Sequence, residues 1–170
     1  MIRMEITAQA NPKEFLAQYT QNSRLSFIGT FRDRLQKFLA RNPSAMAKAF
    51  PTQNSSTSKE RVVLHADMDC FFVSVLIRGR PEKQNVPLAV AHGNTPGTSE
   101  IASCNYAARA HGVKSGMWLD EAMNRCKNLE TLQYDFAQYE EVTDILLKVL
   151  FAFPWVIAVD TVSCDECYVE

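Results

Sequence analysis

The sequence predicts an α/β fold preceded by a helical extension. Short apolar runs alternate with amphipathic segments from about residue 61 onward, which is typical of alternating strands and helices. Residues 51–60 (PTQNSSTSKE) have the composition of a linker. Residues 1–50 carry helix-start signals and apolar side chains at helical spacing. We therefore expect an extension over 1–50, a linker over 51–60 and an α/β domain over 61–170.

Two helices are expected in the extension. The run Asn11-Pro12-Lys13-Glu14 provides an N-cap, a proline at the first helical position and an acid that closes a capping box. Thr30 is expected to cap a second helix, with Asp33 three residues later. The apolar side chains of this second helix recur at helical spacing, at Phe31, Leu35, Phe38 and Leu39.

The α/β domain is expected to alternate strands and helices. Strands are predicted at residues 62–66, 86–91 and 100–104, and helices at 71–77, 106–111, 119–126 and 136–152. The first strand is a continuous apolar run, so we expect it to be buried on both faces. Residues 156–169 form a strand-rich segment, and the chain stops just after it, so we expect an incomplete sheet there.

The composition is that of a globular protein without a membrane segment. Apolar residues make up 46% of the chain, and no apolar run reaches the roughly 18 residues that a membrane helix needs. The first residues lack the apolar stretch of a secretory signal. The five cysteines are an odd number scattered through apolar segments, so we expect reduced, buried thiols. The sequence therefore indicates a soluble intracellular protein.

Charge is distributed unevenly although the net charge is only −1. Residues 23–48 contain six basic residues and one acid, whereas residues 130–170 contain nine acids and one basic residue. A basic region near one end and an acidic region near the other suit an anionic partner and cations, respectively. Solvated charged faces are the alternative interpretation.

Two groups of acids accompany apolar strand segments. Asp67-Met68-Asp69 follows the first predicted strand, and Asp165-Glu166 lies inside the apolar run of residues 162–169. Acids are rare in strand cores unless they are paired or bind metal. If the two strands are neighbours, three carboxylates meet at the sheet edge and could bind Mg²⁺. Two ions about 4 Å apart could activate a 3′-hydroxyl and stabilise a leaving pyrophosphate. Helix caps and surface ion pairs are the alternative.

Other potential sites carry weaker signals. Cys164 and Cys167 form a single CxxC on a predicted strand and would point to opposite faces, so no zinc or redox site is expected. Tyr106 and Arg109 share a face of a predicted helix and could hold a triphosphate, and a surface pair without function is the alternative. The histidines lack a metal-binding spacing and are expected in the core or on the surface: His65, His92 and His111.

Three segments, taken in order, resemble motifs of the Y-family translesion DNA polymerases. Residues 67–75 (DMDCFFVSV) are similar to the first palm motif, and residues 163–166 (SCDE) to the second. Residues 103–109 (SCNYAAR), followed by 112–117 (GVKSGM), are similar to the fingers motif. The resemblance implies an α+β palm sheet with flanking helices and fingers, of which this chain contains an incomplete palm.

The resemblance implies a role for each matching residue. Ligands for two Mg²⁺ ions, which Mn²⁺ could replace, are implied at Asp67, Asp165 and Glu166 and at the backbone carbonyl of Met68. Asp69 would be structural. Phe72 would be the steric gate, an aromatic ring that leaves no room for a ribose 2′-hydroxyl. Nucleotide contacts are implied for Cys70, Phe71, Ser103, Tyr106, Arg109 and Ser115.

The extension resembles the segment that precedes the palm in the deoxycytidyl transferase branch of this family. In that branch the arginine of Ser-Arg-Leu pairs with incoming dCTP, and the leucine fills the space of the displaced template guanine. Arg24 and Leu25 match these positions. Cytosine presents two adjacent acceptors, O2 and N3, and a guanidinium offers two parallel donors. The resemblance therefore implies that Arg24 serves as the template.

The implied enzyme is a nucleotidyltransferase that adds dCMP to a primer 3′-end opposite template G or damaged or missing bases. Implied partners are primer–template DNA and dCTP, with other translesion polymerases and the sliding clamp binding outside this chain. A nuclear location without a membrane is implied as well. We expect the 170-residue chain to be inactive alone.

Three alternatives stay open from the sequence. One is an ordinary template-directed polymerase of the same family, which would lack the Ser-Arg-Leu sequence. Another is a non-catalytic scaffold that only binds DNA or polymerase partners, against which the acids argue. A nucleotidyl cyclase also places acids on a comparable sheet, but Phe71-Phe72 and the fingers motif disfavour it.

Overall fold

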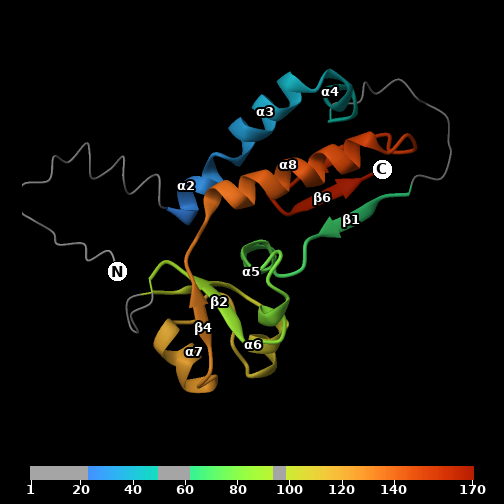
Figure 1. The fold of residues 1–170 in the computed structure, drawn as a ribbon. Helices are drawn as coiled ribbons and strands as arrows, with labels where there is room; N and C mark the ends of the chain where they lie inside the picture. The colour runs from blue at the N-terminus through green and yellow to red at the C-terminus, as the bar shows by residue number, and fades with distance from the viewer. Residues whose placement is uncertain (1–22, 50–61, 94–98) are drawn as a thin grey trace, which may run out of the picture.

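A computed structural model of the protein describes residues 23–49, 62–93 and 99–170. These residues form two three-stranded sheets, and Figure 1 shows helix α5 between the two halves of the molecule. The α/β class expected from the sequence is confirmed. The helix expected after Asn11 and the linker over 51–60 lie outside the described residues.

The first sheet has the strand order β1–β6–β5, and neighbouring strands are antiparallel. Its strands are β1 (Leu64–Asp67), β5 (Val159–Thr161) and β6 (Glu166–Val169). The helices on one face are α3 (Phe31–Arg41), α4 (Pro43–Ala49) and α8 (Phe136–Ala152). Because side chains alternate along a strand, Cys167 and Val169 of β6 are buried in the same cluster as Leu147 and Phe151 of α8. Glu166 and Tyr168 therefore belong to the opposite face.

Strand β1 differs from the expected strand buried on both faces. It begins at Leu64 rather than at residue 62, and Leu64 is 55% exposed. Val62 and Val63 before it are exposed as well. In the part of the chain that the structure describes, β1 pairs only with β6 and helices cover one face of its sheet. The apolar sequence predicted burial, but burial on both faces requires a second covering layer, and His65 and Asp67 on the uncovered face are exposed. Leu64, opposite Val169, lies on the covered face and is exposed at the edge of the sheet.

The second sheet has the order β3–β2–β4. Its strands are β2 (Leu88–Ala91), β3 (Ile101–Cys104) and β4 (Glu130–Leu132). Strand β4 was not predicted, because three residues with two polar side chains give no alternating signal; it pairs in parallel with β2. Strand β2 is buried on both faces, with Ala89 and Ala91 in one core cluster and Leu88 and Val90 in another.

The remaining helices join and cover this sheet. They are α5 (Phe71–Leu76), α6 (Tyr106–Ala110), α7 (Leu119–Arg125) and a short 3-10 helix, η1 (Pro81–Lys83). Side chains of α6 and α7 pack on Ala89 and Ala91, whereas Val73 of α5 packs on Leu88 and Val90. Helix α5 thus lies against the second sheet, and it also contacts α8 of the first half.

A short helix, α2 (Arg24–Gly29), precedes α3 and was not predicted as a separate element. Ser23 caps it, because its Oγ accepts a hydrogen bond from Ser26 N at 3.5 Å. Thr30 occupies the N-cap position of α3 as expected, but its hydroxyl makes no capping bond there. It donates instead to the Ser26 carbonyl at 2.9 Å, since α3 begins directly after α2 ends.

The cysteines and the helix lengths bear on the expectations from composition. All five cysteines are unpaired and buried, as expected. No helix within residues 23–49, 62–93 and 99–170 is both long and apolar enough to cross a membrane.

Asn105 fastens the start of α6 to the second sheet. Its Oδ1 accepts hydrogen bonds from Ala108 N, which caps α6, and from Leu88 N of β2, both at 3.0 Å. Its Nδ2 donates to the Val86 carbonyl at 2.7 Å. Asn105 is itself buried, so these bonds form away from water. They fix the helix that carries Tyr106.

We predict that Asn105→Ala lowers the free energy of unfolding by about 2–4 kcal/mol, because it removes a helix cap and leaves buried backbone groups of β2 unpaired. Urea denaturation of the purified chain measures this change. Asn124→Ala is the matched control, since Asn124 is exposed and accepts one bond from Lys127. The control should differ from the parent by less than about 0.5 kcal/mol. Equal stability of the two variants would contradict the role of Asn105.

Candidate active site

Asp67 and Glu166 face each other at one end of the first sheet. Antiparallel pairing of β1 and β6 places Asp67, the last residue of β1, directly opposite Glu166, the first residue of β6. Directly opposite residues on neighbouring strands have side chains on the same face. The pairing thus brings two acids together although 98 residues separate them in the sequence (166 minus 67, less one).

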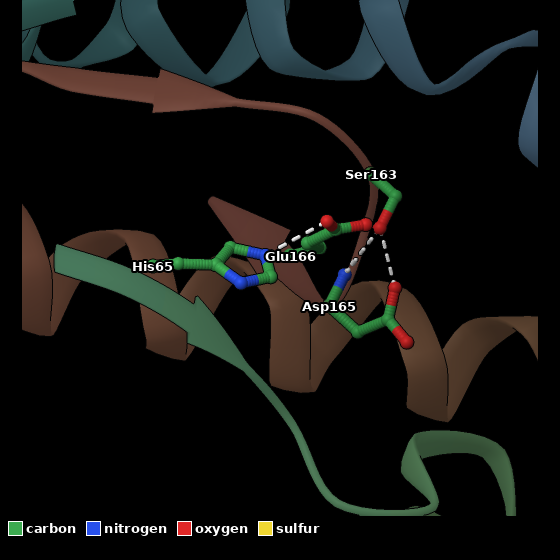
Figure 2. A network of polar contacts seen from close by, with 4 residues as sticks. All are labelled: His65, Ser163, Asp165 and Glu166. Atoms are coloured by element: carbon green, nitrogen blue, oxygen red, sulfur yellow. Dashed lines mark hydrogen bonds and ion pairs between the residues drawn. The ribbon is translucent and has the colours of Figure 1, made fainter. Parts of the chain in front are cut away.

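His65 is a third member of this group, although its spacing predicted only a core or surface position. One donor atom from each of His65, Asp67 and Glu166 lies within 4.8 Å of the others. His65 Nε2 lies 2.8 Å from Glu166 Oε1 (Figure 2). The imidazole also stacks on Tyr168 with ring centroids 4.8 Å apart. The signal that could have found it is the two-residue period of a strand, which puts His65 and Asp67 on one face.

Asp165 lies in the turn between β5 and β6, not in a strand as expected. Its backbone carbonyl accepts a hydrogen bond from Met68 N at 3.0 Å, so it adjoins the end of β1. Its carboxylate accepts a bond from Ser163 Oγ at 2.5 Å (Figure 2). The group of three close donors includes Asp67 and Glu166 but not Asp165. Since a hairpin turn lacks strand alternation, the two-residue period of a strand does not determine which way this carboxylate points.

The donors fit a hard divalent cation. Carboxylate oxygens are the protein ligands that Mg²⁺ prefers, and exposed Asp67 with half-buried Glu166 leaves room for water and phosphate ligands. An imidazole nitrogen beside them also suits Mn²⁺. The group of close donor atoms in the described residues contains no cysteine. Burial, and then the charge of Asp165, raise the pKa of the Cys164 thiol to about 12.

The backbone turns sharply between Asp67 and α5. Cys70 is the only described residue other than glycine with a left-handed backbone, at φ 48°, and it is buried at the N-cap of α5. Phe71 is 2% exposed, and its side chain packs in the core against Tyr139. Phe72 is half-buried and contacts Tyr139 and Tyr134 edge-on, at 4.8 and 6.3 Å between centroids.

Tyr106 and Arg109 lie together on α6, as the sequence spacing predicted. The Arg109 guanidinium carbon is 5.2 Å from the centroid of the Tyr106 ring, and its Nε donates to the Cys104 carbonyl at 3.1 Å. The Tyr106 hydroxyl donates to Asp69 Oδ1 at 2.7 Å, and this bond raises the pKa of Tyr106. Of the other implied nucleotide contacts, Ser103 is buried on β3 and Ser115 is exposed in the turn after α6.

A cavity of about 330 Å³ lies beside the start of α2. Arg24 and Leu25 line it from α2, and Glu100, Trp118 and Tyr134 are among the residues that line it from the second half of the molecule. Arg24 is half-buried, whereas Leu25 is 69% exposed. Burial raises the pKa of Tyr134, and the nearby charge of Arg24 partly offsets this rise. The cavity is therefore lined by an arginine and a leucine from α2 and by an acid and two aromatic rings from the second half of the molecule.

Phe27 and Arg34 hold α2 in place. The Phe27 ring stacks on Phe136 at 5.1 Å and contacts Tyr139 at 6.0 Å. The Arg34 guanidinium lies 3.9 Å from the Phe27 centroid and donates to the Phe27 carbonyl at 2.6 Å. These contacts fix the short helix that begins with Arg24 against α8.

Comparisons with known proteins agree over most of the chain. A family model described as the impB/mucB/samB family matches residues 66–170. The chain is 41% identical to DNA repair protein REV1 of Arabidopsis thaliana, over 92% of this chain and 14% of that protein. It is 37% identical to DNA repair protein rev1 of Schizosaccharomyces pombe, over 90% of this chain and 17% of that protein. The chain thus spans less than a fifth of the length of these relatives.

Solved structures resemble the same region. DinB from Sulfolobus solfataricus matches with a TM-score of 0.56 and 28% identity, over 64% of this chain and 31% of that chain. A Y-family DNA polymerase chimera of Dbh and Dpo4 matches with a TM-score of 0.57, the same identity and the same coverage. The paired strands, the acids at their ends and these matches lead to one conclusion: the chain belongs to the impB/mucB/samB family of Y-family DNA polymerases.

Proposed function

We propose that this chain carries the palm and fingers of a deoxycytidyl transferase that acts in translesion DNA synthesis. The observation that carries the proposal is the position of Arg24 in the cavity whose wall includes Tyr134. Tyr134 in turn contacts Phe72, the expected steric gate, at 6.3 Å. The template arginine and the gate therefore border the same aromatic side chain, as a site that grips both the base and the sugar of one nucleotide requires.

The coverage of the relatives also favours this branch. The match to the Arabidopsis REV1 protein leaves out 8% of the 170 residues (100 minus 92), which is about 14 residues. Because 23 residues precede Arg24, Arg24 lies inside the matched part of the chain. The match to DNA polymerase IV of Francisella philomiragia covers only 66% of this chain. This difference supports the transferase branch over an ordinary template-directed polymerase.

Within the proposed reaction, each part of the site has one task. Asp67 and Glu166, with Asp165 and the Met68 carbonyl beside them, would hold Mg²⁺ or Mn²⁺. When bound, the metal supplies charge stabilisation for the transferring phosphoryl group. Tyr106 and Arg109 donate hydrogen bonds to the triphosphate. The Phe72 ring occupies the space that a ribose 2′-hydroxyl would need.

Arg24 would select the base by hydrogen bonding. Its guanidinium offers parallel donors to O2 and N3 of cytosine, an arrangement that other bases do not match on their pairing edge. A wrong base would leave buried polar groups unpaired, which is why such sites discriminate strongly. Leu25, largely exposed next to Arg24, would occupy the position of the displaced template guanine.

The proposed setting is the nucleus, on primer–template DNA at damaged or missing bases. Duplex binding depends on the sum of many phosphate contacts. We propose that most of these contacts, and those to other translesion polymerases and to the sliding clamp, are made by parts of the protein outside this chain. The 170-residue chain is then inactive by itself although it carries the acids.

The activity can be tested with a chimera in which the S. pombe relative supplies the sequence after residue 170. We predict that this chimera inserts dCMP opposite template G and that Asp67→Asn lowers the rate at least about 100-fold, because metal stabilisation contributes several kcal/mol. Single-nucleotide primer extension measures both. Asp160→Asn, an exposed acid on the same sheet, is the control and should retain the rate. Robust insertion by the 170-residue chain alone, or by the Asp67→Asn chimera, would contradict this account.

Base selection has a separate test in the same chimera. We predict that Arg24→Ala lowers kcat/KM for dCTP by about ten- to a hundredfold, because hydrogen bonds from a charged group contribute about 1.5–3 kcal/mol. Values for the other three nucleotides should change little. Arg32→Ala, an exposed arginine of α3, serves as the control. A uniform loss for all four nucleotides would assign Arg24 to a phosphate or structural contact instead.

A further inference from the structure

The hydrogen bond between Asp69 and Tyr106 connects the turn after β1 to the first residue of α6. The phenol hydroxyl donates to Asp69 Oδ1 at 2.7 Å, a short bond typical of a charged acceptor. The two residues are 37 positions apart and both are exposed. The bond is thus a tertiary contact at the surface of the proposed nucleotide site, not part of the core.

The two partners differ in how firmly they are held. The Asp69 carbonyl accepts a hydrogen bond from Ser74 Oγ at 2.6 Å, and the left-handed backbone of Cys70 follows it. Tyr106 is 60% exposed, and Arg109 lies over its ring. The backbone at Asp69 is therefore held in place, whereas the exposed phenol can rotate about its side-chain bonds and loses only its contact with Arg109.

The hydroxyl cannot serve two anions at once. A tyrosine hydroxyl has one proton to donate, and an ionised aspartate can only accept. If Tyr106 donates to a phosphate oxygen, its own oxygen turns a lone pair toward Asp69, and two acceptors at that distance repel. Donation to Asp69 and donation to a triphosphate are therefore mutually exclusive.

We propose that Asp69 is a positioning residue that competes with the incoming triphosphate for the single hydroxyl proton of Tyr106. The proposal rests on the proposed function, which assigns Tyr106 to the triphosphate. An anion therefore contacts Tyr106 only if the free energy of its own interactions, including those with Arg109, is larger than the free energy lost with the Asp69 bond. Asp69 thereby weakens binding of every anion that takes the Tyr106 proton by the free energy of the lost Asp69 bond.

A double-mutant cycle on the 170-residue chain tests the competition. The four proteins are the parent, Asp69→Asn, Tyr106→Phe and the double variant, and the ligands are Mg²⁺-tripolyphosphate and Mg²⁺-dCTP, measured by calorimetry. An asparagine amide can donate to the phenol oxygen and leave its proton for the phosphate. We expect Asp69→Asn to strengthen tripolyphosphate binding about three- to tenfold. Tyr106→Phe should weaken tripolyphosphate binding in both the parent and the Asp69→Asn protein. The loss in the Asp69→Asn protein should be at least about three times the loss in the parent.

Matched controls separate this effect from net charge and from folding. Asp120→Asn removes an exposed acid of α7 and should leave both affinities unchanged. Asp69→Ala removes the acceptor without adding a donor, and it should also strengthen binding when Tyr106 is present. Thermal melts of each variant identify any that fails to fold, in which case the Asp69→Ala pair replaces the Asp69→Asn pair in the cycle.

Each outcome has a distinct meaning. If Tyr106→Phe has the same effect whether or not Asp69 is present, the competition is wrong although the proposed function can stand. If the parent binds neither ligand, the proposed contact between Tyr106 and the triphosphate is wrong, and so is the competition that depends on it. If tripolyphosphate shows the coupling but dCTP binds no more tightly than tripolyphosphate, the competition holds and the proposed base contact of Arg24 is wrong.

Discussion

The arrangement of the proposed site depends on the packing of the Tyr139 ring against its aromatic neighbours. Tyr139 is fully buried on α8, and its ring lies within 4.8–6.0 Å, centroid to centroid, of Phe27, Phe71, Phe72 and Phe136. Phe27 brings α2 and Arg24 to α8, and the two phenylalanines of α5 bring the segment that follows Asp67. Burial raises the pKa of Tyr139, and its hydroxyl has no hydrogen-bond partner among the described residues. The ring therefore acts as a neutral apolar anchor, and large aromatic rings contribute most of the packing energy of such clusters.

The second constraint is the register between β1 and β6. Because side chains alternate with a period of two, a slip of one residue would turn Asp67 to the helix-covered face and bring Ala66 opposite Glu166. The observed register is favoured because Ala66 of β1, directly opposite Cys167, packs against the same core cluster formed with α8. Core packing on one face of the sheet thus determines the position of the acids on the other, and the position of His65 and Tyr168 beside them.

Much of the fold followed from periodicity, and the differences have physical causes. Helix α8 was predicted with its observed bounds because its apolar side chains recur over a long segment. Strand β4 was missed because three mixed residues carry no period, and the exposure of β1 depends on layers that local sequence does not specify. The close approach of Asp67 and Glu166 could be predicted, because each acid lies beside an apolar strand segment. The turn position of Asp165 and the contact of His65 with Glu166 depend on hairpin geometry and register, which spacing alone does not determine. The metal, nucleotide and template roles of these residues stay predictions.

We propose that Asp67 and Glu166 form a divalent-cation site that a nucleotide triphosphate completes. Electron paramagnetic resonance of Mn²⁺ bound to the 170-residue chain tests this proposal, because it measures binding without requiring turnover. We expect dCTP to increase Mn²⁺ affinity, Glu166→Gln to lower it at least about tenfold by removing a charged ligand, and the neighbouring-strand control Asp160→Asn to leave it unchanged. Equal Mn²⁺ binding by the parent and Glu166→Gln, with and without dCTP, would show that Glu166 is not a ligand.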